Sequence, residues 1–111
     1  MKHRDRARAY YRAIDGDDYE TLEGLLAPAF VHERPDRTLS GRDRFVQFMR
    51  EERPQSDTTH PVDAVYRPVD DRQELVVRGT VLDASGEALV RFVDVFQFDG
   101  DRVERLRTYT R

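Results

Sequence analysis

Absences narrow what this chain can do before any motif is considered. It contains no cysteine, which excludes disulfide bonds, thiolate nucleophiles and zinc–thiolate sites. No stretch approaches the run of about 20 apolar residues that spans a membrane, and residues 1–6 lack the apolar character of a secretory signal. The formal net charge of -3 argues against a general nucleic-acid binder, since such proteins are usually basic. We therefore expect a cytoplasmic protein whose partners include neither a membrane nor a nucleic acid.

The first half of the chain predicts three helices. Apolar side chains recur at helical spacing over residues 4–15, 19–26 and 41–52. The acidic run at residues 15–18 ends the first segment and offers an N-cap for the second, and Ser40 is expected to cap the third. A length of 111 residues without internal repeats predicts that these helices belong to one domain, residues 1–111.

The second half of the chain predicts an antiparallel meander of strands. Short polar breaks with good turn residues separate the apolar segments, and such short connections favour antiparallel neighbours. Together with the helices, this order predicts an α+β fold in which three N-terminal helices pack on one face of a curved, mostly antiparallel sheet. The expected strands are residues 30–33, 60–67, 73–83, 88–98 and 102–110.

Asp94 is the most informative residue, because it lies in the middle of the most apolar stretch. On a strand, Phe92, Asp94 and Phe96 share one face. An unpaired charge between two phenylalanines would be too costly to bury. The carboxyl group must therefore bind a partner, stay protonated or face a polar cavity. The pattern thus indicates a pocket in the fold.

Three pieces of the sequence, in this order, resemble the nuclear transport factor 2-like (cystatin-like) superfamily. They are "YYRAIDGDDYETLEGLLAPAFVHERP", "LSGRDRFVQFMRE" and "VDVFQFDGDRVERLR". Within the superfamily, the SnoaL-like polyketide cyclases and the ketosteroid isomerases are the most similar branches. The resemblance covers nearly the whole chain and implies a cone of helices and sheet around an apolar pocket, with a few polar groups at its floor. Fold alone does not settle function.

The resemblance carries over to this chain only in part. In ketosteroid isomerases a tyrosine and a protonated aspartic acid stabilise the dienolate oxygen, and a second aspartate moves the proton. Tyr10 matches the tyrosine and Asp94 the protonated acid, whereas the base position falls at Arg34, which cannot take up a proton. The histidine and aspartate that SnoaL-like cyclases often carry on the last strand are absent from residues 105–108. The remaining candidates for acid–base work are Tyr10, His32 and Asp94.

Each candidate also has a purely structural interpretation. Asp94 could be a carboxylate bonded to Tyr10, to His32 or to a backbone amide. His32 is either a hydrogen-bonded strand residue or the proton-transfer group, and Tyr10 could simply belong to the core. His60, just before a proline, is predicted to be a solvated loop residue. His32, His60 and Glu33 show no ligand spacing typical of a metal site, so we expect neither a metal nor another cofactor.

Three functions remain open. The first is binding of a compact, partly hydrophobic molecule over a Tyr10–His32–Asp94 polar cluster. The second is an enzyme of the same fold, an isomerase, cyclase or hydrolase, in which His32 is the base and Tyr10 with Asp94 clamps an oxyanion. The third is a ligand-free interaction module whose cone is filled by its own side chains. We also expect a homodimer through the outer sheet face, which the resemblance implies as well. The residues expected to contact a ligand are Phe30, Phe45, Phe48, Met49, Phe92, Phe96, Leu106 and Thr108.

Overall fold

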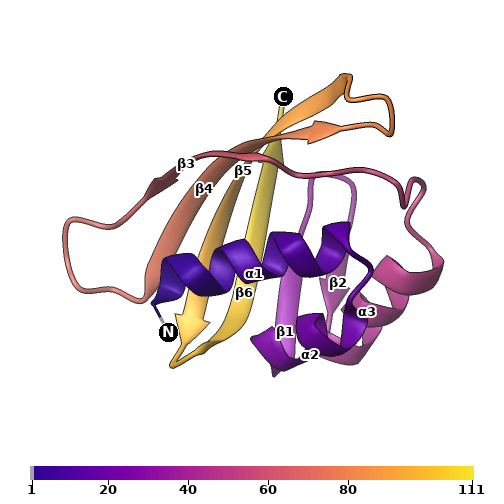
Figure 1. Cartoon of the computed structure of the whole chain (residues 1–111). Coiled ribbons are helices and arrows are strands. Elements are labelled where there is room, and N and C mark those ends of the chain that lie inside the picture. Colours follow the sequence, from indigo (N-terminus) through magenta and orange to yellow (C-terminus); the bar gives the residue numbers. More distant parts are fainter. Residues whose placement is uncertain (1) are drawn as a thin grey trace.

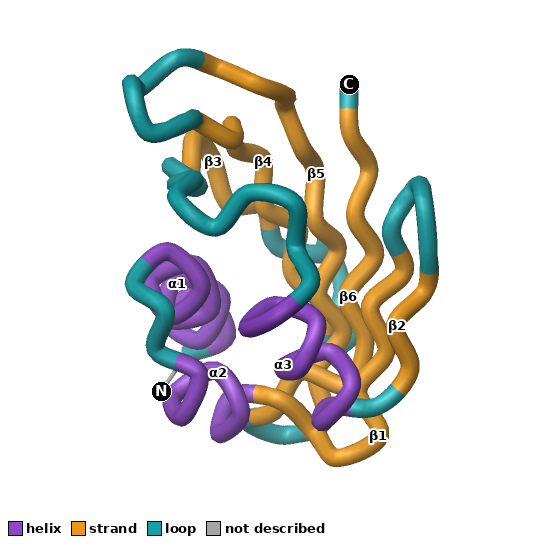
Figure 2. The backbone as a smooth tube through the Cα atoms, turned by 90° about the vertical axis from the view of Figure 1, so that its right-hand side faces the viewer, coloured by secondary structure: helices purple, strands orange, loops and turns teal. Residues whose placement is uncertain are grey.

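The computed structural model describes residues 2–111 and has an α+β architecture (Figure 1). Three helices are combined with one six-stranded sheet, which confirms the predicted fold class. The helices lie on one side of the sheet, whose strands curve around them without closing (Figure 2). The elements in chain order are α1 (His3–Asp15), α2 (Tyr19–Leu25), β1 (Leu26–Glu33), β2 (Thr38–Ser40), α3 (Arg42–Glu51), β3 (Val62–Tyr66), β4 (Glu74–Leu82), β5 (Ala88–Asp99) and β6 (Arg102–Thr110).

The sheet has the strand order β2-β1-β6-β5-β4-β3. Strands β3 to β6 form the predicted meander of antiparallel neighbours. Strand β1 pairs in parallel with β6, so the sheet is mixed. The registers place Asp94 of β5 opposite Thr108 of β6, and His32 of β1 opposite Leu106 of β6. Side chains from three neighbouring strands therefore converge on one inner region of the sheet.

Two details near β1 differ from the sequence-based prediction. Strand β1 begins at Leu26 rather than residue 30, and its pairing with β6 is irregular between Leu26 and Val31. Pro28 is tolerated there because an irregular stretch does not need its missing N–H. Ser40 does not cap α3, since it belongs to β2. Gly41 precedes the helix instead, with a φ of 94° that favours glycine.

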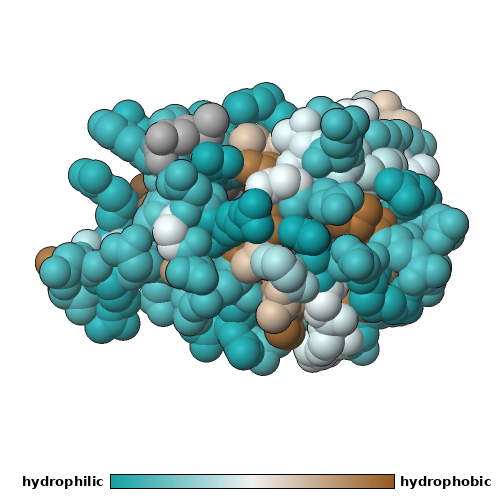
Figure 3. All heavy atoms as spheres, turned by 90° about the horizontal axis from the view of Figure 1, so that it is seen from below, coloured by the Kyte–Doolittle hydropathy of each residue, from teal (hydrophilic) through white to brown (hydrophobic). Residues whose placement is uncertain are grey.

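The core lies between the helices and the inner sheet face. Along β5 the burial alternates, so that Phe92, Asp94 and Phe96 point inward while Val93 and Val95 point outward, as the period-two pattern predicts. On the face seen in Figure 3, the surface is mainly hydrophilic, with a few separate hydrophobic patches. Among residues 2–111, none of the helices is long and apolar enough to cross a membrane.

Candidate functional site

A cavity of about 420 Å³ opens between α1, the segment that leads into β3, and the inner sheet face. Its apolar wall includes Ile14, Met49 and Phe92, and its floor includes Asp94. Small-molecule sites are typically concave, a few hundred Å³ in volume and largely apolar, with a few polar groups that orient the ligand. The cavity therefore has both the size and the lining of a ligand site.

Asp94 lies at the floor and accepts two hydrogen bonds. The Tyr11 hydroxyl donates to Oδ2 over 2.6 Å, and the Thr108 hydroxyl donates to Oδ1 over 2.5 Å. Thr108 is within reach because β6 places it directly opposite Asp94. Only 5% of Asp94 is exposed. The buried carboxyl group is therefore partnered within the protein and also borders the cavity.

Burial raises the pKa of Asp94 above its usual value, and the hydrogen bonds from Thr108 and Tyr11 offset only part of that effect. The pKa of Tyr11 is also raised, first by burial and then by the negative charge of Asp94. Burial thus shifts both groups toward their neutral forms. A carboxyl group that keeps its proton can donate a hydrogen bond, which a carboxylate cannot do.

His32 extends the polar network on the far side of Thr108. Its Nε2 lies 2.8 Å from Thr108 Oγ1. Burial, assisted by the positive charge of Arg34, lowers the pKa of His32 to about 3. The imidazole is therefore neutral near neutral pH. Its Nδ1 is buried without a hydrogen-bond partner among the described residues, so one polar atom of the ring remains unsatisfied.

The number of protons in this network decides what it can offer a ligand. When Asp94 is ionised, the protons of Tyr11, Thr108 and neutral His32 are used in the three hydrogen bonds that link the four residues. Protonation of Asp94 adds a fourth proton while the number of internal bonds stays the same. One proton then becomes free for an acceptor outside the network. The neutral state that burial favours is thus the state that can hydrogen-bond a ligand oxygen.

The hydroxyl partner of Asp94 is Tyr11, not the predicted Tyr10. Both tyrosines are buried on the inner side of α1. Tyr10 lines the cavity too, and its ring packs edge-on against Tyr11 and Phe96, with centroid distances of 5.2 and 5.5 Å. Helical periodicity places both rings on the core side, so it could not decide which hydroxyl reaches the strand.

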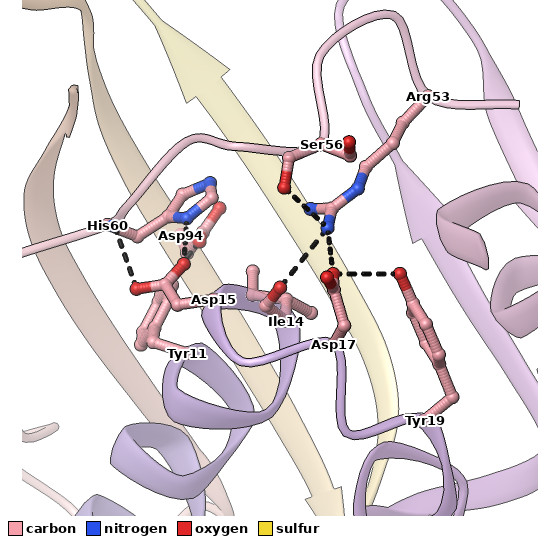
Figure 4. Close-up of polar contacts among 9 residues, drawn as sticks. All are labelled: Tyr11, Ile14, Asp15, Asp17, Tyr19, Arg53, Ser56, His60 and Asp94. Atoms are coloured by element: carbon pink, nitrogen blue, oxygen red, sulfur yellow. Dashed lines mark hydrogen bonds and ion pairs between the residues drawn. The ribbon is translucent and has the colours of Figure 1, made fainter. Parts of the chain in front are cut away.

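His60 is not the solvated loop residue that the sequence predicted. Its Nδ1 lies 2.6 Å from Asp15 Oδ1, and its backbone N–H donates to Asp15 Oδ2 over 2.9 Å (Figure 4). His60 lines the same cavity as Asp94. One signal was available in the sequence: Tyr11 and Asp15 are one helical turn apart and therefore share a face. Helical spacing cannot identify His60 as the partner of Asp15, because the two residues are 45 positions apart in the sequence.

The residues expected to contact a ligand fall into two groups. Met49, Phe92 and Thr108 line the cavity together with Tyr10, His32 and Asp94. The others do not line it, because their side chains pack against one another and against Tyr10 in a solid part of the core. This group comprises Phe30, Phe45, Phe48, Phe96 and Leu106, each 0% exposed.

Two arginines, Arg34 and Arg53, line the cavity. Arg53 is held by the Ile14 and Ser56 carbonyl groups and by Asp17 Oδ1, over 3.2, 3.3 and 2.8 Å, so it ties the end of α1 to the segment before β3 (Figure 4). Arg34 lies over the Phe48 ring at 5.3 Å. Within residues 2–111, no three histidine or acidic side chains are grouped so as to hold a metal ion.

The sequence of residues 7–106 matches the family model of the SnoaL-like domain. This match covers most of the chain. The chain belongs to the SnoaL-like domain family. No curated protein matches its sequence. The resemblance noted from the three sequence pieces is therefore confirmed at the level of the family.

Solved structures share the SnoaL-like fold at low sequence identity. A protein from Kribbella flavida that is provisionally called a ketosteroid isomerase is 22% identical, with a TM-score of 0.82 over 98% of this chain and 77% of that chain. A provisional polyketide cyclase from Sinorhizobium meliloti is 19% identical, with a TM-score of 0.79 over 95% and 94%. A nuclear transport factor 2-like protein of unknown function from Burkholderia pseudomallei is 22% identical, with a TM-score of 0.81 over 100% and 92%. Identities this low establish the fold alone.

Proposed function

We propose that this SnoaL-like protein binds a compact, partly hydrophobic molecule in the cavity, with an oxygen of the ligand accepting a hydrogen bond from the Asp94 network. The observation that carries the proposal is a buried carboxyl group at the floor of a cavity of about 420 Å³. A structural carboxyl group would not need an adjoining cavity. The third alternative, a cone filled by its own side chains, is disfavoured by the same volume.

The polarity of the lining defines the kind of ligand. Apolar side chains such as Ile14 and Phe92 can cover a hydrocarbon skeleton. Protonated Asp94 and Tyr11 supply a neutral donor, which suits a carbonyl or phenol oxygen. We therefore expect small ketones, lactones and phenols to bind more tightly than hydrocarbons of the same size.

A thermal-shift and calorimetry screen over such compounds tests the proposal, with 2-naphthol as the first probe. A ligand that binds only the folded state raises the melting temperature, by an amount equivalent to about 2.7 kcal/mol at a hundredfold excess over its Kd. Val90→Phe, which places a ring in the cavity wall, should reduce the shift. Val69→Phe, at a fully exposed residue outside this cavity, is the matched control. Equal shifts in both variants, or no shift with any compound, would contradict the proposal.

We also infer that a second copy of the chain covers the outer sheet face. Val93 and Val95 point outward from β5, and Tyr109 beside them is 56% exposed. On the same face Arg105 forms an ion pair with Glu33 over 3.1 Å. Such a surface, with apolar centre and charges of both signs, can meet its own copy around a two-fold axis.

A further inference from the structure

The Asp15–His60 pair has a geometry that defines the protonation of the imidazole ring. Both oxygens of Asp15 are engaged by His60, one by the backbone N–H and the other by Nδ1. A ring nitrogen that bonds to a carboxylate carries the proton, so the lone pair of the neutral ring is on Nε2. Nε2 makes no hydrogen bond to any residue in the described part of the chain. The ring therefore holds one unused acceptor in a fixed orientation.

The imidazole ring borders the cavity beside the Asp94 network. It packs over Tyr11, whose hydroxyl bonds to Asp94, at 6.2 Å from centroid to centroid (Figure 4). It also packs edge-on against Phe92 at 5.9 Å. Tyr11, Phe92 and Asp94 all line the cavity with His60. The side chain of His60 is 17% exposed, so a molecule inside the cavity could reach it. The Tyr11 ring thus lies between the imidazole of His60, which can accept a proton, and the Asp94 network, which can donate a hydrogen bond.

We infer that His60, oriented by Asp15, is the base of an enzymatic proton transfer in this cavity, and that the substrate is a neutral ketone with an acidic C–H next to its carbonyl group. The inference rests on the proposed function, because the ketone must first bind over Asp94. It places the base on the segment before β3, whereas the resemblance to ketosteroid isomerases places it at Arg34.

The proposed reaction is balanced without a cofactor. His60 Nε2 takes the proton from the carbon next to the carbonyl group, and the C–H electron pair forms the carbon–carbon double bond of an enolate. The carbonyl π electrons move to oxygen, where the Asp94 network donates a hydrogen bond. The proton then returns from Nε2 to the same carbon, or to a carbon conjugated with it. The net change is an exchange or a shift of one hydrogen, so no oxidant or reductant is needed.

His32, the base expected from the sequence, is less suited to this role. Its Nε2 is already bonded to Thr108, and the ring is only 6% exposed. His60 is more open to the cavity and has Nε2 free. The two histidines therefore have separate tasks: His32 completes the network below the carboxyl group, and His60 accepts the proton.

His60 could instead be no more than a brace between α1 and the segment before β3. The variant His60→Asn separates the two roles, because its amide nitrogen can replace Nδ1 as the donor to Asp15 while nothing replaces the Nε2 lone pair. Binding of 2-naphthol, a planar analogue of an enolate, reports whether the cavity of the variant is intact. Removal of the base from an intact cavity lowers the rate of proton transfer far more than it weakens binding.

The experiment follows exchange of the α-hydrogens of 2-tetralone in D₂O by proton NMR, with calorimetry of 2-naphthol on the same samples. We expect the wild-type protein to accelerate exchange over buffer, and His60→Asn to lose about 100-fold or more of that rate with a much smaller loss of 2-naphthol affinity. Free imidazole should restore part of the exchange to His60→Ala, which gives a second readout if His60→Asn is poorly folded.

The possible failures are distinguishable. If 2-naphthol binds but the wild-type protein does not accelerate exchange, or if His60→Asn exchanges as fast as wild type, the inference is overturned and the proposed binding function stands. If neither 2-naphthol nor any ketone of the screen binds, the proposed function fails and this inference fails with it.

Discussion

Acidification should destabilise the protein through His32. Burial lowers the pKa of His32 from 6.5 to about 3, so the unfolded chain takes up a proton that the native imidazole does not accept. Because the folded-state pKa is the lower one, this stabilisation is complete above about pH 6.5 and is lost as the pH falls toward about 3. The full window corresponds to about 5 kcal/mol, and the part lost by about pH 5 to about 2 kcal/mol. Domains of this size are stable by only about 5–15 kcal/mol.

A matched variant isolates this contribution from those of other titrating groups. Asp94 acts in the opposite direction, since its raised pKa gives stability at low pH that is lost as the pH rises through the folded-state value. His32→Gln retains a side-chain N–H that can reach Thr108 but cannot bind a proton. Between about pH 7 and about pH 5, urea unfolding should show wild type losing about 2 kcal/mol more than the variant.

Equal losses of unfolding free energy in the two proteins would refute this reasoning. An NMR titration provides an independent check, because the His32 ring protons should show no shift between pH 7 and about pH 5 in the native protein. A midpoint near 6.5 would mean that water reaches the imidazole and that the ring is not desolvated as described.

Four further substitutions test the packing and the assembly. Gly79→Ala should destabilise by about 1–3 kcal/mol, because a Cβ would lie 2.5 Å from Phe92 Cζ, whereas Gly24→Ala, with nothing within 4 Å in α2, should stabilise by about 0.5–1 kcal/mol. Urea unfolding of both variants checks the opposite signs. Phe96→Ala should cost about 3–5 kcal/mol in the same measurement, and a loss below about 1 kcal/mol would contradict a solid core at this ring. Val95→Glu should keep the far-UV circular dichroism and yield monomers in light scattering; a wild-type protein that is itself monomeric would contradict the inferred dimer.

Local patterns were sufficient for most of the fold. Period-two alternation identified the inner face of β5 and the burial of Asp94, and helical spacing identified all three helices. Strand β2 was missed because three residues are too short to show a period. Residues 35–37 indicate a turn, but the turn alone does not show that the chain after it pairs with β1.

The site was less predictable than the fold because its contacts are tertiary. Sequence patterns identified Asp94 and His32, but the Thr108 hydroxyl that joins them depends on the β5–β6 register. The choice between Tyr10 and Tyr11 depends on how α1 is rotated against the sheet, which is set by tertiary packing. The pairing of His60 depends on where a loop ends, which no periodicity encodes.

The position of β6 has a consequence for how the molecule comes apart. Within the sheet of residues 2–111, β6 is the one strand that pairs with both the β1–β2 ladder and the three-stranded ladder of β3, β4 and β5. Loss of the β6 pairings would divide the sheet into two separate ladders and expose the unpaired edges of β1 and β5. Amide hydrogens in the middle of β6 should therefore exchange with solvent only when the whole molecule unfolds. Pairing of β1 with β6, which are far apart in the sequence, should be the rate-limiting step of folding.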